Sequence, residues 1–157
     1  MARAREVPGL DCEEPFARAA ARVVAVRAEE VFDQADGVLD VDDVERVHDM
    51  RVATRRLRAA LEVFEPCFPR KRFRKALKRV KALADALGER RDRDVAIAFL
   101  EEAGEGIAGD DRAALEATIE RLGEEQAAAN EALSAAVAPK RLKKLRRRLR
   151  RLAKEAA

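Results

Sequence analysis

The sequence predicts an all-α protein, an antiparallel bundle of about four to six helices, on three grounds. Alanine, leucine, glutamate, lysine and arginine dominate, while tryptophan and tyrosine are absent and only three residues are serine or threonine. This composition favours helices over strands. Apolar residues recur at spacings of three and four along most of the chain, as on one face of a helix. Short connections between these segments favour antiparallel neighbours, and 157 residues suffice for one domain.

The first helix is expected over residues 15–36. Pro15 suits an early helical position, and Gly37 is placed to end the helix. Residues 1–14 are expected to form a flexible N-terminal extension, so that a single domain spans residues 15–157.

A proline-bounded connection separates the next two helices. Asp40 is a plausible N-cap for a second helix that runs to about Glu65, after which Pro-Cys-Phe-Pro at residues 66–69 requires a tight turn. A third helix is expected to begin near Pro69. Its pattern continues beyond Gly88, which we expect to kink the helix rather than end it. The apolar face of this helix comprises Phe73, Leu77, Val80, Ala84 and Leu87.

The last third of the chain contains a loop and two further helices. Residues 102–110 are rich in glycine and form the clearest loop, and Asp110 is the expected N-cap of a long helix. Pro139 opens the final helix. The apolar positions are Leu115, Ile119, Leu122, Ala129 and Leu133 on the long helix, and Leu142, Leu145, Leu149 and Leu152 on the final one.

The net charge of +3 conceals a strong segregation of charge along the chain. Residues 66–81 contain eight basic side chains and no acid, and residues 139–154 contain ten, again without an acid. Between residues 110 and 131, seven acids oppose two arginines. Runs of like charge are commonly solvated helix faces, but a basic patch also marks proteins that bind polyanions.

A helical wheel drawn for residues 44–64 separates an apolar side from a basic stripe. The apolar side must face the core, so the stripe faces outward, and no acid lies along the same line of the helix. Like charges at this spacing cost roughly 0.2–0.5 kcal/mol per pair, while arginine can hold phosphate oxygens through two donors at once. From spacing alone, a solvated face and an anion site are equally good interpretations. The stripe consists of His48, Arg51, Arg55 and Arg58, opposite Met50, Ala53, Leu57, Ala60, Leu61 and Phe64.

Two further helices carry basic stripes of their own. The stripe that borders the apolar face of the third helix consists of Arg74, Lys78 and Lys81. On the final helix, the cations directly opposite the leucines are Lys140, Lys144, Arg147 and Arg151. Each stripe alone is explained as a solvated face, but three basic helices in one small bundle favour a protein that binds a polyanion.

Two motifs resemble those of the CHAD family, the conserved histidine α-helical domain. The stretch VHDMRVATRRLRAALEVF has the histidine and following arginines of the family signature, at His48, Arg51, Arg55, Arg56 and Arg58. LGERRDRDV, residues 87–95, is similar to the second motif of the family, and Arg91 stands where that motif has an arginine. The family usually has a basic residue upstream of this motif, and Lys81 stands at that position. The resemblance covers residues 12–155. It implies a helical bundle that binds inorganic polyphosphate in a basic channel, often in association with polyphosphate granules.

The resemblance and the basic stripes together predict a polyphosphate-binding site that uses no metal or other cofactor. The usual domain of the family is about twice as long and contains two similar halves, whereas this chain resembles the first half alone. We therefore expect a homodimer in which two copies of the His48 helix approach one shared channel. The predicted site comprises His48, Arg51, Arg55, Arg58, Arg74, Lys78, Lys81, Arg91, Lys140, Lys144, Arg147 and Arg151.

Three other functions stay open. Contacts to the phosphate backbone alone could bind nucleic acid, although most of the phenylalanines sit at apolar positions that suit core packing better than base stacking. An acidic protein could occupy the basic face instead. An enzyme is less consistent with the sequence, because Ser134 is the only serine and the single Glu45-x-x-His48 motif falls short of the two that a di-iron bundle needs.

The sequence also predicts a soluble, cytoplasmic protein without a membrane partner. No apolar stretch approaches membrane-spanning length, and the N-terminus lacks an apolar secretory segment. Cys12 and Cys67 have neither metal-binding nor redox spacing, which suits free thiols in a reducing compartment.

Overall fold

A computed structural model of the chain describes residues 3–157 and confirms the all-α prediction. No strand occurs within this described range, and none of its helices is both long and apolar enough to cross a membrane. The elements are α1 (Phe16–Asp33), α2 (Val44–Val63), the short 3₁₀-helix η1 (Glu65–Cys67), α3 (Arg70–Ala103), α4 (Gly109–Val137) and α5 (Pro139–Lys154).

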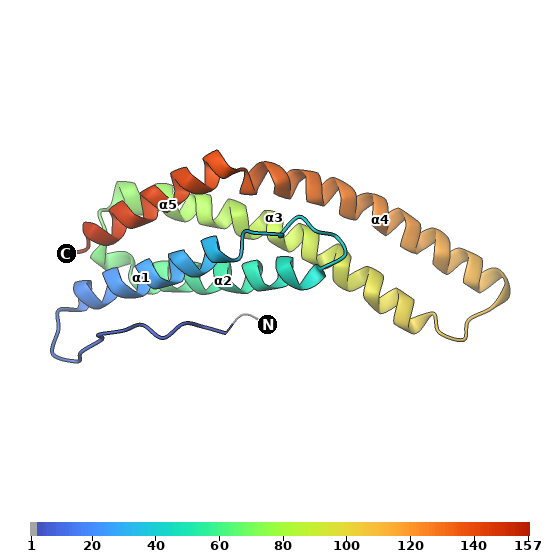
Figure 1. The fold of residues 1–157 in the computed structure, drawn as a ribbon, viewed down its shortest axis with the longest axis horizontal. Helices are drawn as coiled ribbons and strands as arrows, with labels where there is room; N and C mark the ends of the chain where they lie inside the picture. The colour runs from blue at the N-terminus through green and yellow to red at the C-terminus, as the bar shows by residue number, and fades with distance from the viewer. Residues whose placement is uncertain (1–2) are drawn as a thin grey trace.

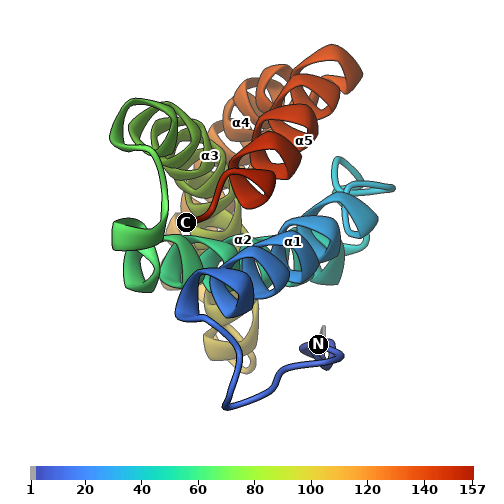
Figure 2. The same ribbon diagram turned by 90° about the vertical axis from the view of Figure 1, so that its left-hand side faces the viewer.

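The helices form a bundle with a projecting hairpin (Figure 1). α1, α2, the first half of α3 and α5 surround the core, as the end-on view in Figure 2 shows. α4 runs back antiparallel to α3, and only Ala138 separates α4 from α5, which packs against both α1 and α3. The second half of α3 and the first half of α4 extend beyond the other helices. This arrangement brings α5 beside the first half of α3, so the two acid-free basic segments become neighbours.

The apolar faces predicted for α2, α3 and α5 meet in the core, whereas on α4 only Leu133 of the predicted face is buried. Phe64, the last apolar residue of the α2 face, is half-buried, and its ring lies 5.0 Å from that of Phe16, measured between ring centres. α5 is held to the bundle by its leucines, because each fully buried leucine side chain contributes roughly 1.5–3 kcal/mol. The buried residues include Met50, Ala53, Leu57, Ala60 and Leu61 on α2, Phe73, Val80 and Leu87 on α3, and Leu145, Leu149 and Leu152 on α5.

The helix boundaries agree with the predicted ones to within two residues, except at the end of α1 and at two N-caps. α1 ends at Asp33 rather than at residue 36, so Gly37 lies in the turn that follows and does not end the helix. Asp40 does not cap α2, because its carboxylate accepts the backbone N–H of Asp42 at 3.0 Å in a turn that precedes the helix. Asp110 does not cap α4 either, since the helix begins one residue earlier, after Ala108. Asp110 lies in the first turn instead, where a negative charge still interacts favourably with the helix dipole. α3 runs through Gly88 as one helix, as its periodicity predicted, and the kink expected at Gly88 stays a prediction.

The segment before α1 lies against that helix. The Arg5 side chain pairs with Asp33, the Arg5 backbone N–H donates to Glu30 at 2.5 Å, and Arg22 donates to the carbonyl oxygen of Gly9. These contacts join the extension to α1 along most of its length. The flexibility expected for residues 1–14 stays a prediction.

Candidate functional site

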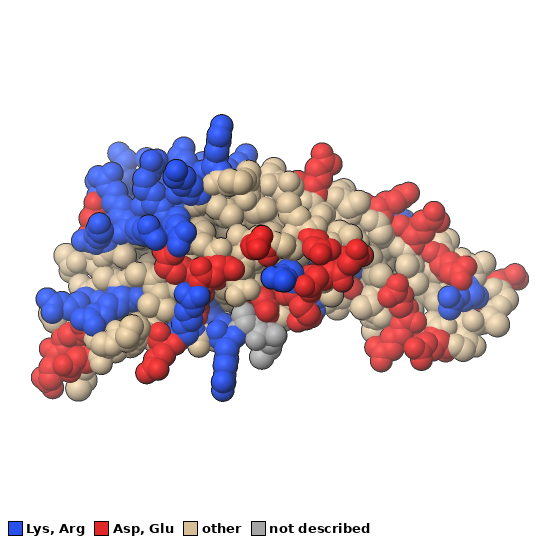
Figure 3. Space-filling model, viewed as in Figure 1, with Lys and Arg blue, Asp and Glu red and all other residues tan. Residues whose placement is uncertain are grey.

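Lysine and arginine side chains gather at one end of the molecule, over α5, while acidic side chains predominate on the projecting hairpin (Figure 3). The basic end combines ten cations from α5 with eight from the first three turns of α3. Thirteen of these eighteen cations have no carboxylate partner within residues 3–157. The positive charge of this surface is therefore largely uncompensated.

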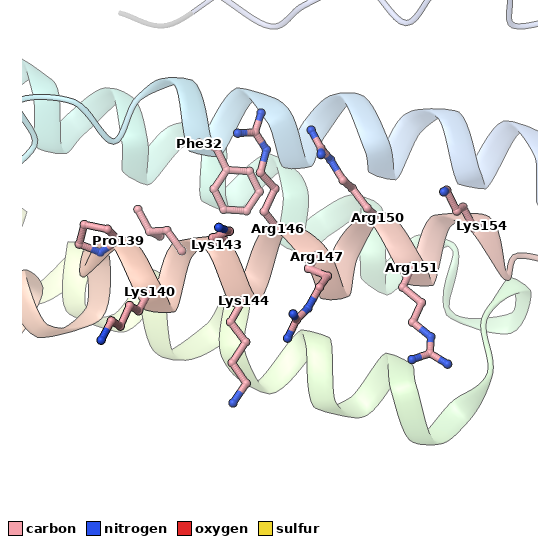
Figure 4. Close-up of a pocket in the computed structure, with 11 residues that line it drawn as sticks. Phe32, Pro139, Lys140, Lys143, Lys144, Arg146, Arg147, Arg150, Arg151 and Lys154 are labelled. Atoms are coloured by element: carbon pink, nitrogen blue, oxygen red, sulfur yellow. The ribbon is translucent and has the colours of Figure 1, made fainter.

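The two flanks of α5 have different environments (Figure 4). Arg146 and Arg150 point toward α1, where both donate to the carboxylate of Glu29. The flank that points away from α1 carries the four predicted residues Lys140, Lys144, Arg147 and Arg151. Of these four, only Arg151 has a carboxylate partner in the described part of the chain, Glu155 at 3.1 Å. Eight of the ten cations of α5 line a hollow of about 1070 Å³.

Three residues of the predicted stripe of α2, Arg51, Arg55 and Arg58, line a groove between α2 and α3 with a volume of about 370 Å³, and His48 lies outside this lining. Arg58 donates to Glu62 at 3.0 Å, whereas Arg51 and Arg55 have no ion-pair partner among the described residues. The wheel of α2 shows no acid along the line of the stripe, yet the opposite wall of the groove carries three acids. The opposite wall belongs to α3, which a wheel of one helix does not include; it contributes Ala84, Asp85, Gly88, Glu89 and Asp92.

Arg58 and Lys81 share one carboxylate across this groove. Glu62 accepts from Arg58 and also lies 3.5 Å from Lys81 Nζ, so it links α2 to α3. The hydrogen bond from Arg58, with a smaller effect of Lys81, lowers the pKa of Glu62. Arg74 and Lys78, the other predicted residues of α3, are exposed and have no carboxylate partner within the described range.

His48 lies at the beginning of the α2 stripe, half-buried, beside two carboxylates. The ligand atoms of Glu45, His48 and Asp49 lie within 4.8 Å of one another, a separation that one divalent cation could bridge. Arg91 restrains this cluster, because its guanidinium lies 3.7 Å from Glu45 and donates to the carbonyl oxygen of Val44 at 3.2 Å. Arg91 therefore joins α3 to the first turn of α2, apart from the exposed cations of α5.

A second groove, between α3 and α5, contains basic residues that the sequence did not single out. It has a volume of about 250 Å³, and no acid lines it. Arg79, Arg141 and Arg148 were missed because they lie on helix flanks, and a wheel of a single helix does not reveal which flanks face each other. The acid-free composition of both segments was the available signal. The floor of the groove consists of Ala82, Leu83, Ala136, Leu142 and Leu145, and its rim of Arg79, Arg141, Lys144 and Arg148.

Comparisons with known proteins agree with this arrangement. The family model of the CHAD domain matches residues 22–157, nearly the whole chain. Searches among curated proteins and among solved structures found no match.

Proposed function

The chain belongs to the CHAD domain family, which is linked to polyphosphate binding, and from this premise we propose that it binds inorganic polyphosphate by electrostatic capture. The observation that carries the proposal is the basic end, where thirteen cations of α3 and α5 have no carboxylate partner within the described residues. Such a surface attracts a polymer that carries charge on every unit, because bound counterions are released when phosphates replace them.

The distribution of the cations favours a long, flexible ligand. Arg51 and Arg55 lie in the α2–α3 groove, and Arg74 and Lys78 lie on the exposed side of α3. The predicted residues on α5 are Lys140, Lys144, Arg147 and Arg151. One phosphate group reaches only a few of these side chains. A polyphosphate chain can follow them from helix to helix, with arginine forks holding its oxygens.

The aromatic residues favour polyphosphate over nucleic acid. Phe32 lines the hollow beside α5, but the Arg146 guanidinium already covers its ring at 5.3 Å from the ring centre. The two well-exposed phenylalanines are Phe16 and Phe99, and neither lines a basic hollow. Single-strand binders usually place stacking rings in the basic groove. Polyphosphate should therefore displace DNA readily, and DNA should displace polyphosphate poorly.

A titration with polyphosphate of defined length at several salt concentrations tests the proposal. The logarithm of the affinity should fall linearly with the logarithm of the salt concentration, with a slope of about 0.7 per neutralised phosphate by analogy with single strands. Replacing Lys144 and Arg147 by alanine, or Arg51 and Arg55, should weaken binding and reduce this slope. In both variants the helix content measured by circular dichroism should be unchanged.

The matched control removes two cations from the acidic hairpin. Arg112 and Arg121 each pair with a glutamate on the same helix, so the double alanine variant lowers the net charge equally without touching the basic end. Its affinity for polyphosphate should remain close to that of the wild type. Equal losses in the control and in the Lys144 and Arg147 variant would contradict a localised site.

We further propose that binding involves no reaction and that two copies act together. Incubation with polyphosphate and magnesium should release no phosphate; release would favour an enzyme. A pair of chains would extend the basic surface beyond that of one copy, in keeping with two copies of α2 at a shared channel. Sedimentation equilibrium at micromolar concentration should give twice the 17.5 kDa mass of one chain. Association with polyphosphate granules in the cytoplasm would follow from the same ligand, and a fluorescent fusion would reveal it.

A further inference from the structure

The projecting hairpin is strongly acidic and has little internal compensation. Residues 92–126, which we call the arm, contain eleven acids and three arginines. Each of the three arginines already pairs with a glutamate, Arg93 with Glu89 and Glu125, Arg112 with Glu116, and Arg121 with Glu125. In Figure 1 the arm extends past the ends of α1, α2 and α5. Apart from Asp94, which is buried beside Arg90, the remaining carboxylates of the arm face solvent at the end of the molecule opposite to α5 (Figure 3).

One face of the arm carries apolar side chains between two of these carboxylates. Asp92, Val95, Phe99 and Glu102 follow one another at spacings of three, four and three, which places them along a single stripe of α3. All four are exposed, Val95 by 51% and Phe99 by 66%. We call these four residues the arm stripe. α2 leaves the stripe uncovered, because this helix begins at Val44, beside Arg91.

The α3–α5 groove has the complementary chemistry. Its floor is apolar, and none of its four cations has a carboxylate partner within the described residues. Polyphosphate has no apolar atoms and gains nothing from such a floor, whereas an aromatic side chain flanked by carboxylates matches both floor and rim. With about 250 Å³, the groove can admit one aromatic ring.

We propose that the arm stripe of one copy docks into the α3–α5 groove of a second copy. Phe99 would lie on the apolar floor, while Asp92 and Glu102 would approach Arg79 and Arg148 of the rim. The occupant must be another molecule, because Ala82 of the groove and Phe99 lie on the same continuous helix, about 25 Å apart at 1.5 Å per residue. The inference rests on the proposed pairing of two copies and identifies a contact between them.

Complementation between two variants tests this contact. Phe99→Asp damages the arm stripe, and Arg79→Glu with Arg148→Glu damages the groove. Each variant alone should sediment at the mass of one chain, because in a pair of identical variants each contact would include one damaged surface, either the arm stripe or the groove. A mixture of the two should recover the mass of a pair, because one intact arm stripe then meets one intact groove. Val63→Asp is the matched control: Val63 is also 66% exposed but lies on α2, outside both surfaces, and its variant should pair like the wild type.

The outcomes separate this contact from the other proposals. A wild type that stays monomeric overturns the pairing and the contact together, while polyphosphate titration of the same sample tests the ligand independently. A pair that survives Phe99→Asp, or a mixture that does not recover it, overturns the contact and leaves the pairing standing. Circular dichroism of each variant shows whether the fold is retained. If Phe99→Asp proves unfolded, the same mixing experiment with Phe99→Ser tests the contact instead.

Discussion

Glu29 illustrates how a single carboxylate attaches a strongly basic helix to the bundle. It accepts from Arg146 and Arg150 of α5, the latter at 3.0 Å, and thereby joins α5 to α1. The hydrogen bond from Arg146 is the main cause that holds the pKa of Glu29 below its ordinary value of 4.5, against the opposing effect of burial. The flank of α5 away from α1 is left without such compensation, which is the flank that we assign to the ligand.

The lowered pKa of Glu29 predicts a contribution to stability that acid removes. Because the folded-state pKa lies below the unfolded value, the stabilisation is fully present above about pH 4.5 and is lost as pH falls through the folded-state pKa. Partly exposed pairs of this kind contribute about 0.2–1 kcal/mol. Glu29→Gln should therefore lower the melting temperature by a few degrees at pH 7 and show a smaller further loss below pH 4.5 than the wild type.

Thermal melts followed by circular dichroism between about pH 3 and pH 7 measure this difference. Glu120→Gln is the control, because Glu120 is exposed and forms no ion pair within the described residues. Its melting temperature should follow that of the wild type at every pH. Parallel curves for Glu29→Gln and the wild type would show that the two arginines do not stabilise the fold through Glu29.

The orientation of an individual side chain was predicted correctly from the sequence where it depends on the periodicity of a single helix. Arg51 and Arg55 face outward as the wheel predicted, because the apolar side of α2 must face the core. The wheel did not reveal Asp85 and Glu89 across the groove. It also missed Arg79 of the α3–α5 groove, since opposing flanks are set by the packing of two helices rather than by the periodicity of either.

Among the elements, α3 is notable for a glycine at its middle that the packing does not require. A Cβ atom at Gly88 would meet no atom within 4 Å, and Gly88 has no left-handed backbone conformation. The same holds for Gly123 in α4. Glycine inside a helix costs about 0.5–1 kcal/mol relative to alanine, because its unfolded chain has more conformational freedom to lose.

Gly88→Ala and Gly123→Ala should therefore each stabilise the protein by about 0.5–1 kcal/mol. For a chain of this length the melting temperature should rise by about 1–4 °C, and the two effects should add because the sites do not touch. Thermal and urea denaturation measure the change. A loss of stability at Gly88 alone would mean that α3 bends at this residue in solution or that another chain packs closely against it.

The helices themselves could be predicted because periodicity and composition act along the whole length of each element. Pro139 opens α5 and the leucine seam faces the core as expected, although Leu142 is only half-buried. The two N-caps could not be predicted, because the first turn depends on the local backbone path. Asp40 is used in a turn before α2, and Ala108 rather than Asp110 precedes α4.

The whole molecule separates its charges, with the two acid-free basic segments at one end and the acidic arm at the other (Figure 3). The sequence showed the charge runs, but only the fold shows that residues 139–154 return beside the first half of α3. The exposed pair of Val95 and Phe99 was likewise unpredictable, because a wheel cannot tell where the covering helix α2 ends.

A ligand held at the basic end should stabilise the entire fold, because polyphosphate contacts α3 and α5 only when they lie side by side. At a free concentration one hundred times the dissociation constant, the gain is about 2.7 kcal/mol, which corresponds to about 5–10 °C in melting temperature. Orthophosphate at the same total phosphorus concentration should have a much smaller effect, since separate ions do not bridge distant cations. Differential scanning calorimetry measures both. Equal shifts would contradict capture of a polymer.

The long hairpin has a practical consequence for determining how many chains associate. α3 has thirty-four residues and is therefore about 51 Å long, whereas a compact domain of this size has a radius of gyration of about 15 Å. A particle of this shape experiences more friction than a sphere of equal mass and elutes early from a gel-filtration column calibrated with rounded standards. A monomer would then elute at the volume expected of a larger protein. The number of associated chains should therefore be determined by a method that measures molecular mass independently of particle shape.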